Sequence, residues 1–109
     1  MKTFRTLELA IEFHELAVNL KVSGHLRDQL LRAASSIPLN LSEGNAKYSV
    51  KEKKRFYQTA YASLKECQTI LKMAKPDDAK AHATADHLGA CLYKLLESKA
   101  TEVILKTPF

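Results

Sequence analysis

Apolar residues recur every three or four positions along most of this chain, the spacing that places side chains on one face of an α-helix. Only three glycines and three prolines are present, too few for the many turns of a small β-sandwich or barrel, whereas four helices need only three connections. The 109 residues, 46% of them hydrophobic, are enough to bury one core. The sequence therefore predicts a single all-α domain over residues 1–109.

Four helices are expected, at about residues 4–22, 25–43, 50–75 and 78–100, followed by a tail at 101–109. The second keeps its helical spacing straight through Pro38, so we expect one helix kinked there, because an interior proline loses a backbone hydrogen bond and costs about 3 kcal/mol. Short connections between amphipathic helices favour an antiparallel up-down-up-down four-helix bundle. In the first helix a broad apolar stripe is expected to face inward: Leu7, Leu9, Ile11, Phe13, Leu16, Val18 and Leu20.

Two connections carry local signals. Gly44 is expected to take the left-handed conformation just past the end of the second helix. Ser49 followed by Glu52 has the pattern of a capping box at the start of the third helix. No stretch approaches the roughly 20 apolar residues that span a bilayer, and acidic residues interrupt the N-terminal segment where a signal peptide would be apolar, so we expect a cytoplasmic protein.

The positive charge of the chain is concentrated in its third helix. Residues 44–75 contain eight lysines and arginines against Glu52 and Glu66, whereas the remaining residues carry a net charge of −1. Steps of four and three place many of these cations in one row without an acid, opposite the apolar side. Like charges one turn apart repel, and Lys51, Lys53, Lys54 and Arg55 crowd a helix end whose dipole is already positive, so the row works against stability.

A polyanionic partner accounts for such a row, because lysines neutralise phosphates while tyrosine and glutamine stack and donate hydrogen bonds. The alternative is a solvated face that keeps the protein soluble. The residues expected to bind nucleic acid, called the lysine face below, are Lys47, Lys51, Lys54, Arg55, Gln58, Tyr61, Lys65 and Lys72.

Motifs for catalysis or cofactor binding are missing from the sequence. The four histidines are not spaced to share a helical face as metal ligands, and no zinc or di-iron motif is present. Neither a phosphate-binding glycine loop nor a nucleophile elbow is found. We therefore expect no metal, no cofactor and no enzyme activity.

Two stretches resemble a known family. Residues 31–44 (LRAASSIPLNLSEG) and 60–66 (AYASLKE) are similar to the four-helix-bundle family named for intervening sequences of bacterial 23S ribosomal RNA genes. A more distant similarity is to the accessory variability determinant proteins of diversity-generating retroelements. Two positions depart from the family pattern: Ala62 replaces a glycine, and Lys47 replaces an arginine and loses its bidentate fork.

The resemblance implies a four-helix bundle and a ring of five subunits. In the retroelement branch it also implies nucleic-acid binding beside a reverse transcriptase. The recurring positions of the family fall on the polar residues Ser36, Asn40, Glu43 and Glu66 and on the terminal Gly44. These residues either form a binding site or hydrogen-bond around the Pro38 kink and end the second helix, the reading we favour.

Together these observations predict a non-enzymatic, basic, homo-oligomeric accessory protein that binds RNA or DNA through the lysine face. The alternative is a protein-interaction scaffold, for example a reverse-transcriptase partner, in which nucleic-acid binding is secondary or absent.

Overall fold

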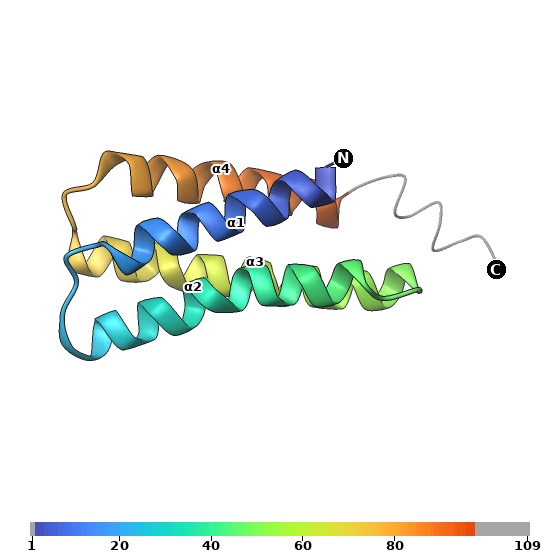
Figure 1. Ribbon diagram of the computed structural model, residues 1–109, viewed down its shortest axis with the longest axis horizontal. Coiled ribbons are helices and arrows are strands. Elements are labelled where there is room, and N and C mark those ends of the chain that lie inside the picture. The colour runs from blue at the N-terminus through green and yellow to red at the C-terminus, as the bar shows by residue number, and fades with distance from the viewer. Residues whose placement is uncertain (1, 98–109) are drawn as a thin grey trace.

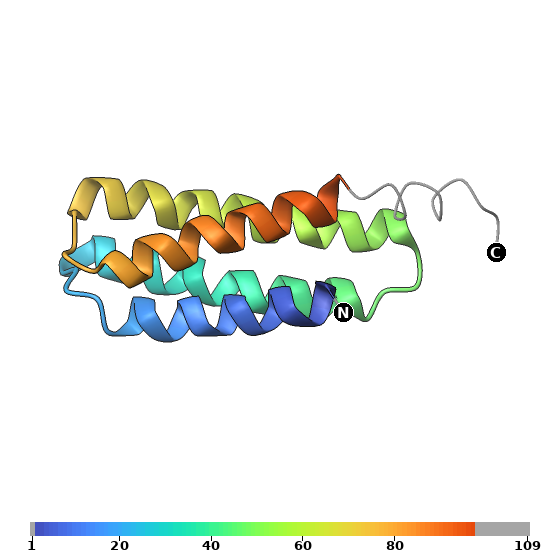
Figure 2. The ribbon, with the colours of Figure 1, turned by 90° about the horizontal axis from the view of Figure 1, so that it is seen from above.

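The computed structural model describes residues 2–97, with side chains from Phe4 onward, and contains four helices in that range. They are α1 (Lys2–Val18), α2 (Gly24–Asn45), α3 (Val50–Ala74) and α4 (Ala79–Leu96). Successive helices run in opposite directions, and each packs against its neighbour in the sequence, while α1 also packs against α4 (Figures 1 and 2). The predicted all-α four-helix bundle is confirmed. The fourth helix ends at Leu96, with Glu97 as its C-cap, before the predicted end near residue 100. Residues 98–109, which include the predicted tail at 101–109, lie outside the described residues.

The pair α2 and α3 is the longest part of the bundle and has the most extensive helix contact. Its connecting turn, residues 46–49, reaches beyond the described ends of α1 and α4 (Figures 1 and 2). We call this turn, together with the first two turns of α3, the tip. Four of the expected nucleic-acid contacts therefore lie at the tip, on Lys47, Lys51, Lys54 and Arg55.

The first helix differs from its prediction in length and in orientation. It ends at Val18, and Leu20 and Val22 stay buried in the connection to α2 although they are not helical. The Arg27 guanidinium donates hydrogen bonds to the carbonyls of Val18, at 3.0 Å, and Leu20, at 3.2 Å, which satisfies groups left open where the helix stops. Because Leu20 and Val22 continue the apolar spacing of the helix, the sequence pattern placed the end of the first helix four residues too late.

The inward face of α1 is narrower than predicted. Its buried side chains are Thr6, Ala10, Phe13 and Ala17, of which only Phe13 is large. The predicted inward positions Ile11 and Val18 are 44% and 40% exposed and belong to the outer face. The physical reason is that α2 and α4 cover only part of the circumference of α1, so apolar residues on its flank stay in solvent.

The second helix passes through Pro38 without a break, as expected. Ile37 and Leu41 on either side of the proline are both fully buried, so the core face keeps its phase. Near the proline, the Asn40 Nδ2 donates to the carbonyl oxygen of Ser36, at 2.8 Å, and to its Oγ, at 2.9 Å. The Ser36 Oγ also shares a hydrogen bond of 2.9 Å with the Ser63 Oγ of α3. A bend of the axis at Pro38 stays a prediction.

These hydrogen bonds support the structural reading for Ser36 and Asn40. The Ser36–Ser63 bond joins α2 to α3, and the Asn40 bonds, within α2, hold Ser36 beside it. The other two polar positions behave differently: Glu43 and Glu66 are exposed, and their carboxylates make no hydrogen bond within the described residues. The four polar family positions therefore divide into Ser36 and Asn40, which are hydrogen-bonded near Pro38, and two acids on the surface.

Gly44 corrects a prediction. It lies inside α2 and is buried, and the only glycine with a positive φ in the described part of the chain is Gly24. A Cβ built on Gly44 would lie 2.9 Å from the Tyr57 Cε1 and 3.0 Å from the Phe56 Cβ of α3. The position is therefore reserved for glycine by the close approach of α3 and not by a left-handed turn.

Among residues 2–97, no helix combines the length and the apolar content that crossing a membrane requires.

Candidate nucleic-acid interface

The residues of the lysine face follow one side of α3 from the tip to its last turn, as the spacing predicted. Five side chains are exposed and three are half-buried. The exposed ones are Lys51, Arg55, Gln58, Lys65 and Lys72, and the half-buried ones are Lys47, Lys54 and Tyr61. Since α3 turns seven of these groups to one flank while its opposite side packs in the core, they share a continuous helical surface, and Lys47 precedes it in the connecting turn.

No acid neutralises this surface directly within the described residues. No carboxylate oxygen of residues 4–97 lies within 4.0 Å of the ammonium groups of Lys51, Lys54, Lys65 or Lys72. Glu52 belongs to the tip, where its backbone N–H donates to the Ser49 Oγ, at 3.0 Å. That bond is one half of the predicted capping box, and the return bond from the Glu52 carboxylate is not formed in this part of the chain.

The aromatic rings of this flank hold cations in place. The Lys47 Nζ lies 5.1 Å from the centroid of the Phe56 ring, and the Arg55 guanidinium carbon lies 5.7 Å from the same centroid. The Lys65 Nζ lies 5.1 Å from the centroid of the Tyr61 ring, which itself packs against the core. Such cation–π contacts orient the side chains while leaving the charge available to a ligand. Tyr61 therefore supports a lysine, and its covered ring is poorly placed for the stacking role predicted for it.

Lys53 has a structural role that the sequence pattern did not reveal. Its Nζ donates to the carbonyl of Asn45, at 3.0 Å, and more weakly to that of Gly44, at 3.4 Å. These carbonyls belong to the C-terminal end of α2, which carries the negative end of the helix dipole. The crowding of cations at the start of α3 is thus partly offset by the adjacent end of α2. The sequence pattern of α3 alone does not show this contact, because it depends on the antiparallel helix α2 lying beside Lys53.

Toward the C-terminal end of α3, a polar hollow of about 300 Å³ lies between α3 and α4, next to the lysine face. Lys65 and Lys72 line it together with His82 and Asp86 of α4. The Asp86 Oδ1 accepts a hydrogen bond of 3.1 Å from the Gln68 Nε2. Asp86 reduces the positive potential along this half of the face, so the tip is the more positive half. Both α4 residues escaped the sequence analysis, because they meet α3 only in the folded bundle.

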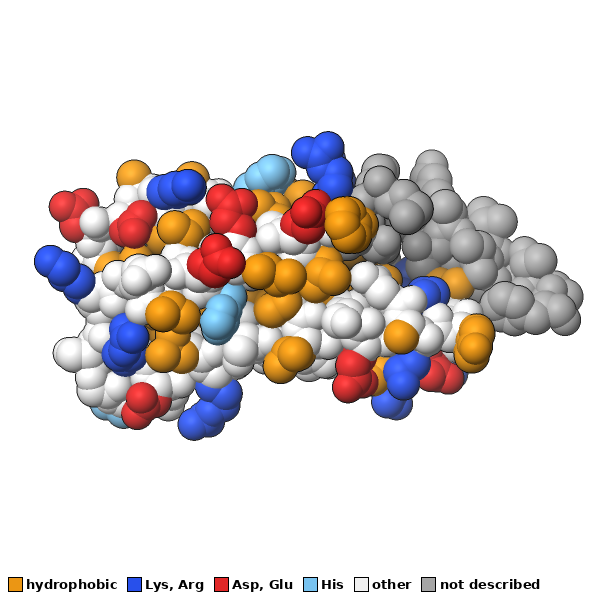
Figure 3. Space-filling view, viewed as in Figure 1, with side chains coloured by type: hydrophobic (Ala, Val, Ile, Leu, Met, Phe, Trp, Pro, Cys, Tyr) orange, Lys and Arg blue, Asp and Glu red, His pale blue; other side chains and the backbone are white. Residues whose placement is uncertain are grey.

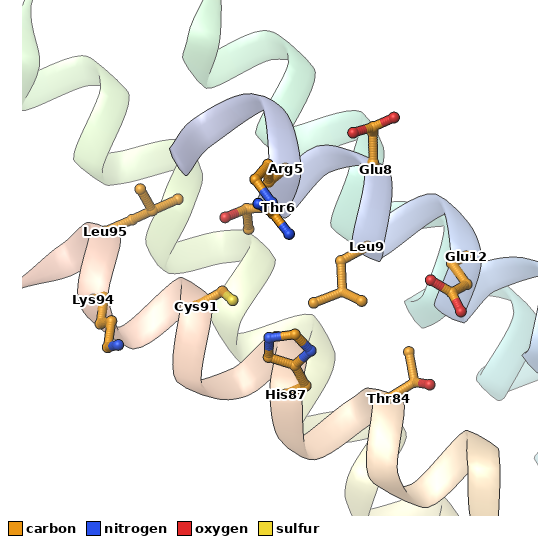
Figure 4. Close-up of a pocket in the computed structure, with 10 residues that line it drawn as sticks. All are labelled: Arg5, Thr6, Glu8, Leu9, Glu12, Thr84, His87, Cys91, Lys94 and Leu95. Carbon is orange, nitrogen blue, oxygen red and sulfur yellow. The ribbon is translucent and has the colours of Figure 1, made fainter. Parts of the chain in front are cut away.

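A larger hollow, with a volume of about 650 Å³, lies between α1 and α4 (Figure 4). Arg5 and Lys94 contribute cations to its lining, while Glu8 and Glu12 contribute acids. This mixed charge does not suit a polyphosphate, and the hollow is on a different side of the bundle from the lysine face. No three His, Cys, Asp or Glu side chains come together as a metal site in the described residues.

The two cysteines differ in their environments. Burial, reinforced by the nearby Glu66 charge, raises the pKa of the Cys67 thiol to about 12. Cys91 is half-buried and lines the hollow between α1 and α4 (Figure 4). Neither cysteine belongs to the lysine face. Alkylation of the cysteines can therefore measure how well each one is buried without changing the candidate site.

We expect iodoacetamide at about pH 8 to alkylate Cys91 and spare Cys67 in the folded protein, since the thiolate is the nucleophile and Cys67 stays protonated there. Because the raised pKa of Cys67 lies far above this pH, its reaction should need denaturant. Mass spectrometry of tryptic peptides measures both sites, with a Cys91→Ala variant as the control. Equal alkylation of both cysteines under native conditions would contradict the buried position of Cys67.

A comparison with protein-family models matches residues 4–100 to the model described as 23S rRNA-intervening sequence protein. No curated protein matches the chain. The match spans all four helices and the whole lysine face. The chain therefore belongs to the family of 23S rRNA-intervening sequence proteins.

Proposed function

We propose that this chain is a non-enzymatic, homo-oligomeric accessory protein that binds RNA or DNA through the lysine face. The observation that carries the proposal is the row of ammonium groups on α3, which meets no carboxylate at ion-pair distance within the described residues. Its family takes its name from an RNA, and this favours nucleic acid over other polyanions.

The chemistry of the face fits a phosphate backbone. Lysines provide mobile point charges, and each one that contacts a phosphate releases a counterion from the nucleic acid. Lys72 lies in the last turn of α3, where a cation is favoured by the helix dipole, and the other lysines extend the charge toward the tip. This contact set gives affinity without reading base sequence.

A salt titration of the wild-type protein tests the proposal. We expect the logarithm of the binding constant for a fluorescein-labelled RNA to fall linearly with the logarithm of salt concentration, with a slope of about −3 to −4 if four lysines contact phosphates. Fluorescence anisotropy between about 50 and 300 mM KCl measures this slope. Absence of binding at the lowest salt, or binding that salt leaves unchanged, would refute the proposal.

The outer face of α1 favours the oligomeric part of the proposal. Phe4, Ile11 and Val18 are 56%, 44% and 40% exposed, and the half-buried Leu7 and His14 lie between them. These five residues, called the outer seam, follow the alternating steps of three and four that are typical of helix-to-helix packing in coiled coils. Figure 3 shows hydrophobic side chains gathered on this side of the bundle. A second copy of the chain is the partner we propose for the outer seam, and the resemblance implies a ring of five.

Size-exclusion chromatography with light scattering checks this assembly. We expect the wild type to elute as an oligomer and Ile11→Glu as a monomer, because a carboxylate buried in an apolar interface is strongly unfavourable. Leu39→Glu is the matched control, since Leu39 is 65% exposed on α2 outside the outer seam. A monomeric wild type, or an Ile11→Glu variant that assembles normally, would refute the proposed assembly through the outer seam. A protein partner such as a reverse transcriptase would then be the candidate for binding to the outer seam.

A further inference from the structure

Tyr48 stands at the tip with its ring almost entirely in solvent. It is 95% exposed, compared with 65% for Leu39, the next most exposed large hydrophobic side chain of the described residues. Its hydroxyl and ring make no hydrogen bond or ring contact in that part of the chain. Phe56 and Tyr61 already carry cations on their rings, so Tyr48 offers an aromatic face that is free for a ligand.

The backbone that presents Tyr48 is held on both sides. On the α2 side, the Tyr57 hydroxyl donates to the Asn45 Oδ1, at 2.6 Å, and the Lys53 Nζ donates to the Asn45 carbonyl. On the α3 side, Ser49 caps the helix through the Glu52 N–H. A turn fixed in this way loses little conformational entropy when it binds a ligand. The exposed ring is therefore displayed by an ordered turn.

The charges around this ring define the ligand class. Lys47 and Lys51 flank Tyr48 in the sequence, and Lys54 and Arg55 follow within the first two turns of α3. A flat π-surface among cations suits a nucleotide, whose base stacks while its phosphates pair with lysines. In a continuous duplex the bases are stacked on each other and do not offer a free face. Only unpaired nucleotides in single strands, loops or ends do so.

We propose that the Tyr48 ring stacks on an unpaired nucleobase, so that the tip prefers single-stranded or looped nucleic acid to continuous duplex. This inference rests on the proposed function and deepens it. The lysine face supplies sequence-independent attraction to any phosphate backbone. Tyr48 adds a contact that depends on the state of the bases and not on charge.

The absence of tryptophan from the sequence permits a direct test with Tyr48→Trp. Two probes are used: oligoadenylate RNA of about 12 nucleotides, and a blunt mixed-sequence RNA duplex of the same length. We expect the fluorescence of the single indole to be quenched by the oligoadenylate and to change little with the duplex. An indole signal that responds equally to both probes, or to neither, would overturn the preference.

Affinity measurements on Tyr48→Ala complete the test. We expect about a tenfold loss of affinity for oligoadenylate, little change for duplex, and near wild-type behaviour for Tyr48→Phe, which keeps the ring. The ratio between wild type and Tyr48→Ala should stay constant as salt rises, because stacking releases no counterions. Tyr93→Ala is the matched control, since Tyr93 is also exposed but lies on α4.

The outcomes separate this inference from the proposed function. If the wild type binds neither probe, both are refuted. If a variant carrying Lys51→Glu and Lys54→Glu loses binding while Tyr48→Ala binds oligoadenylate as the wild type does, stacking is refuted and the lysine face stands. If Tyr48→Ala lowers the affinity for both probes equally, the ring acts only as a general contact and the preference for unpaired bases is refuted.

Discussion

Reversal of Lys51, Lys54, Lys65 and Lys72 to glutamate is expected to lower the affinity for RNA by more than about a hundredfold at low salt. Each substitution removes a phosphate contact and adds a like charge beside the backbone. The salt dependence should weaken as well, by about one unit of slope for each lysine that contacts a phosphate. Fluorescence anisotropy over a range of KCl concentrations measures both effects. Three of these lysines are exposed and Lys54 is half-buried, so circular dichroism should show an intact helical fold.

A control with the same net charge separates position from total charge. Each reversal lowers the net charge by two, so four reversals carry the chain from +5 to −3 wherever they are made. The control variant reverses four exposed cations outside the lysine face, namely Lys21, Arg32, Lys80 and Lys94. We expect it to lose some affinity through the long-range field and to keep the salt slope of the wild type. Equal losses in the two variants would mean that net charge, and not the lysine face, governs binding.

The helices and their buried faces could largely be predicted from the sequence because they depend on local spacing. On α2, Leu30, Ile37 and Leu41 follow helical spacing and are buried, and Pro38 leaves their phase unchanged. On α4, Leu88 and Leu92 likewise follow helical spacing and are buried. In each case the apolar row is clear and the neighbouring helices cover the whole of it.

Features that depend on two helices at once could not be predicted in the same way. The spacing of α1 places Ile11 beside the core row, but how far the buried arc extends around a helix depends on where its neighbours stand. In the sequence, Lys53 is one more cation in a crowded helix end. In the structure, its ammonium group donates a hydrogen bond to the Asn45 carbonyl of α2. Helix contacts between distant segments decide both cases.

The candidate site shows the same division. The lysine face was predicted from steps of three and four along one helix, and those side chains do share one flank of α3. Tyr61 lies in the predicted row, yet its ring packs toward the core under Lys65. Tyr48 precedes the helix, so no periodicity assigned it to a face, and only the ordered turn reveals its exposure.

Replacement of Gly44 by alanine is expected to destabilise the fold by about 1 to 3 kcal/mol, the usual cost of overpacking a filled core. The new Cβ would meet the Tyr57 ring at 2.9 Å and the Phe56 Cβ at 3.0 Å. The ring cannot swing away freely, because it is buried and its hydroxyl is bonded to Asn45. The steric cost should exceed the gain of about 1 kcal/mol that alanine brings to a helix interior. Chemical denaturation at a fixed protein concentration measures the change in the free energy of unfolding.

Two further variants decide between close packing and a left-handed turn as the reason for glycine at this position. Gly89→Ala, in the middle of α4, would place its Cβ 3.3 Å from the Leu64 Cδ2, a looser contact than the 2.9 Å at Gly44, so a shift of a few tenths of an ångström relieves it. It should therefore leave stability unchanged or raise it by up to about 1 kcal/mol. Asparagine tolerates the left-handed conformation but is larger than alanine, so Gly44→Asn should be less stable than Gly44→Ala if packing is the constraint. The opposite order would show that Gly44 serves as a helix terminator and that the contact with Tyr57 is incidental.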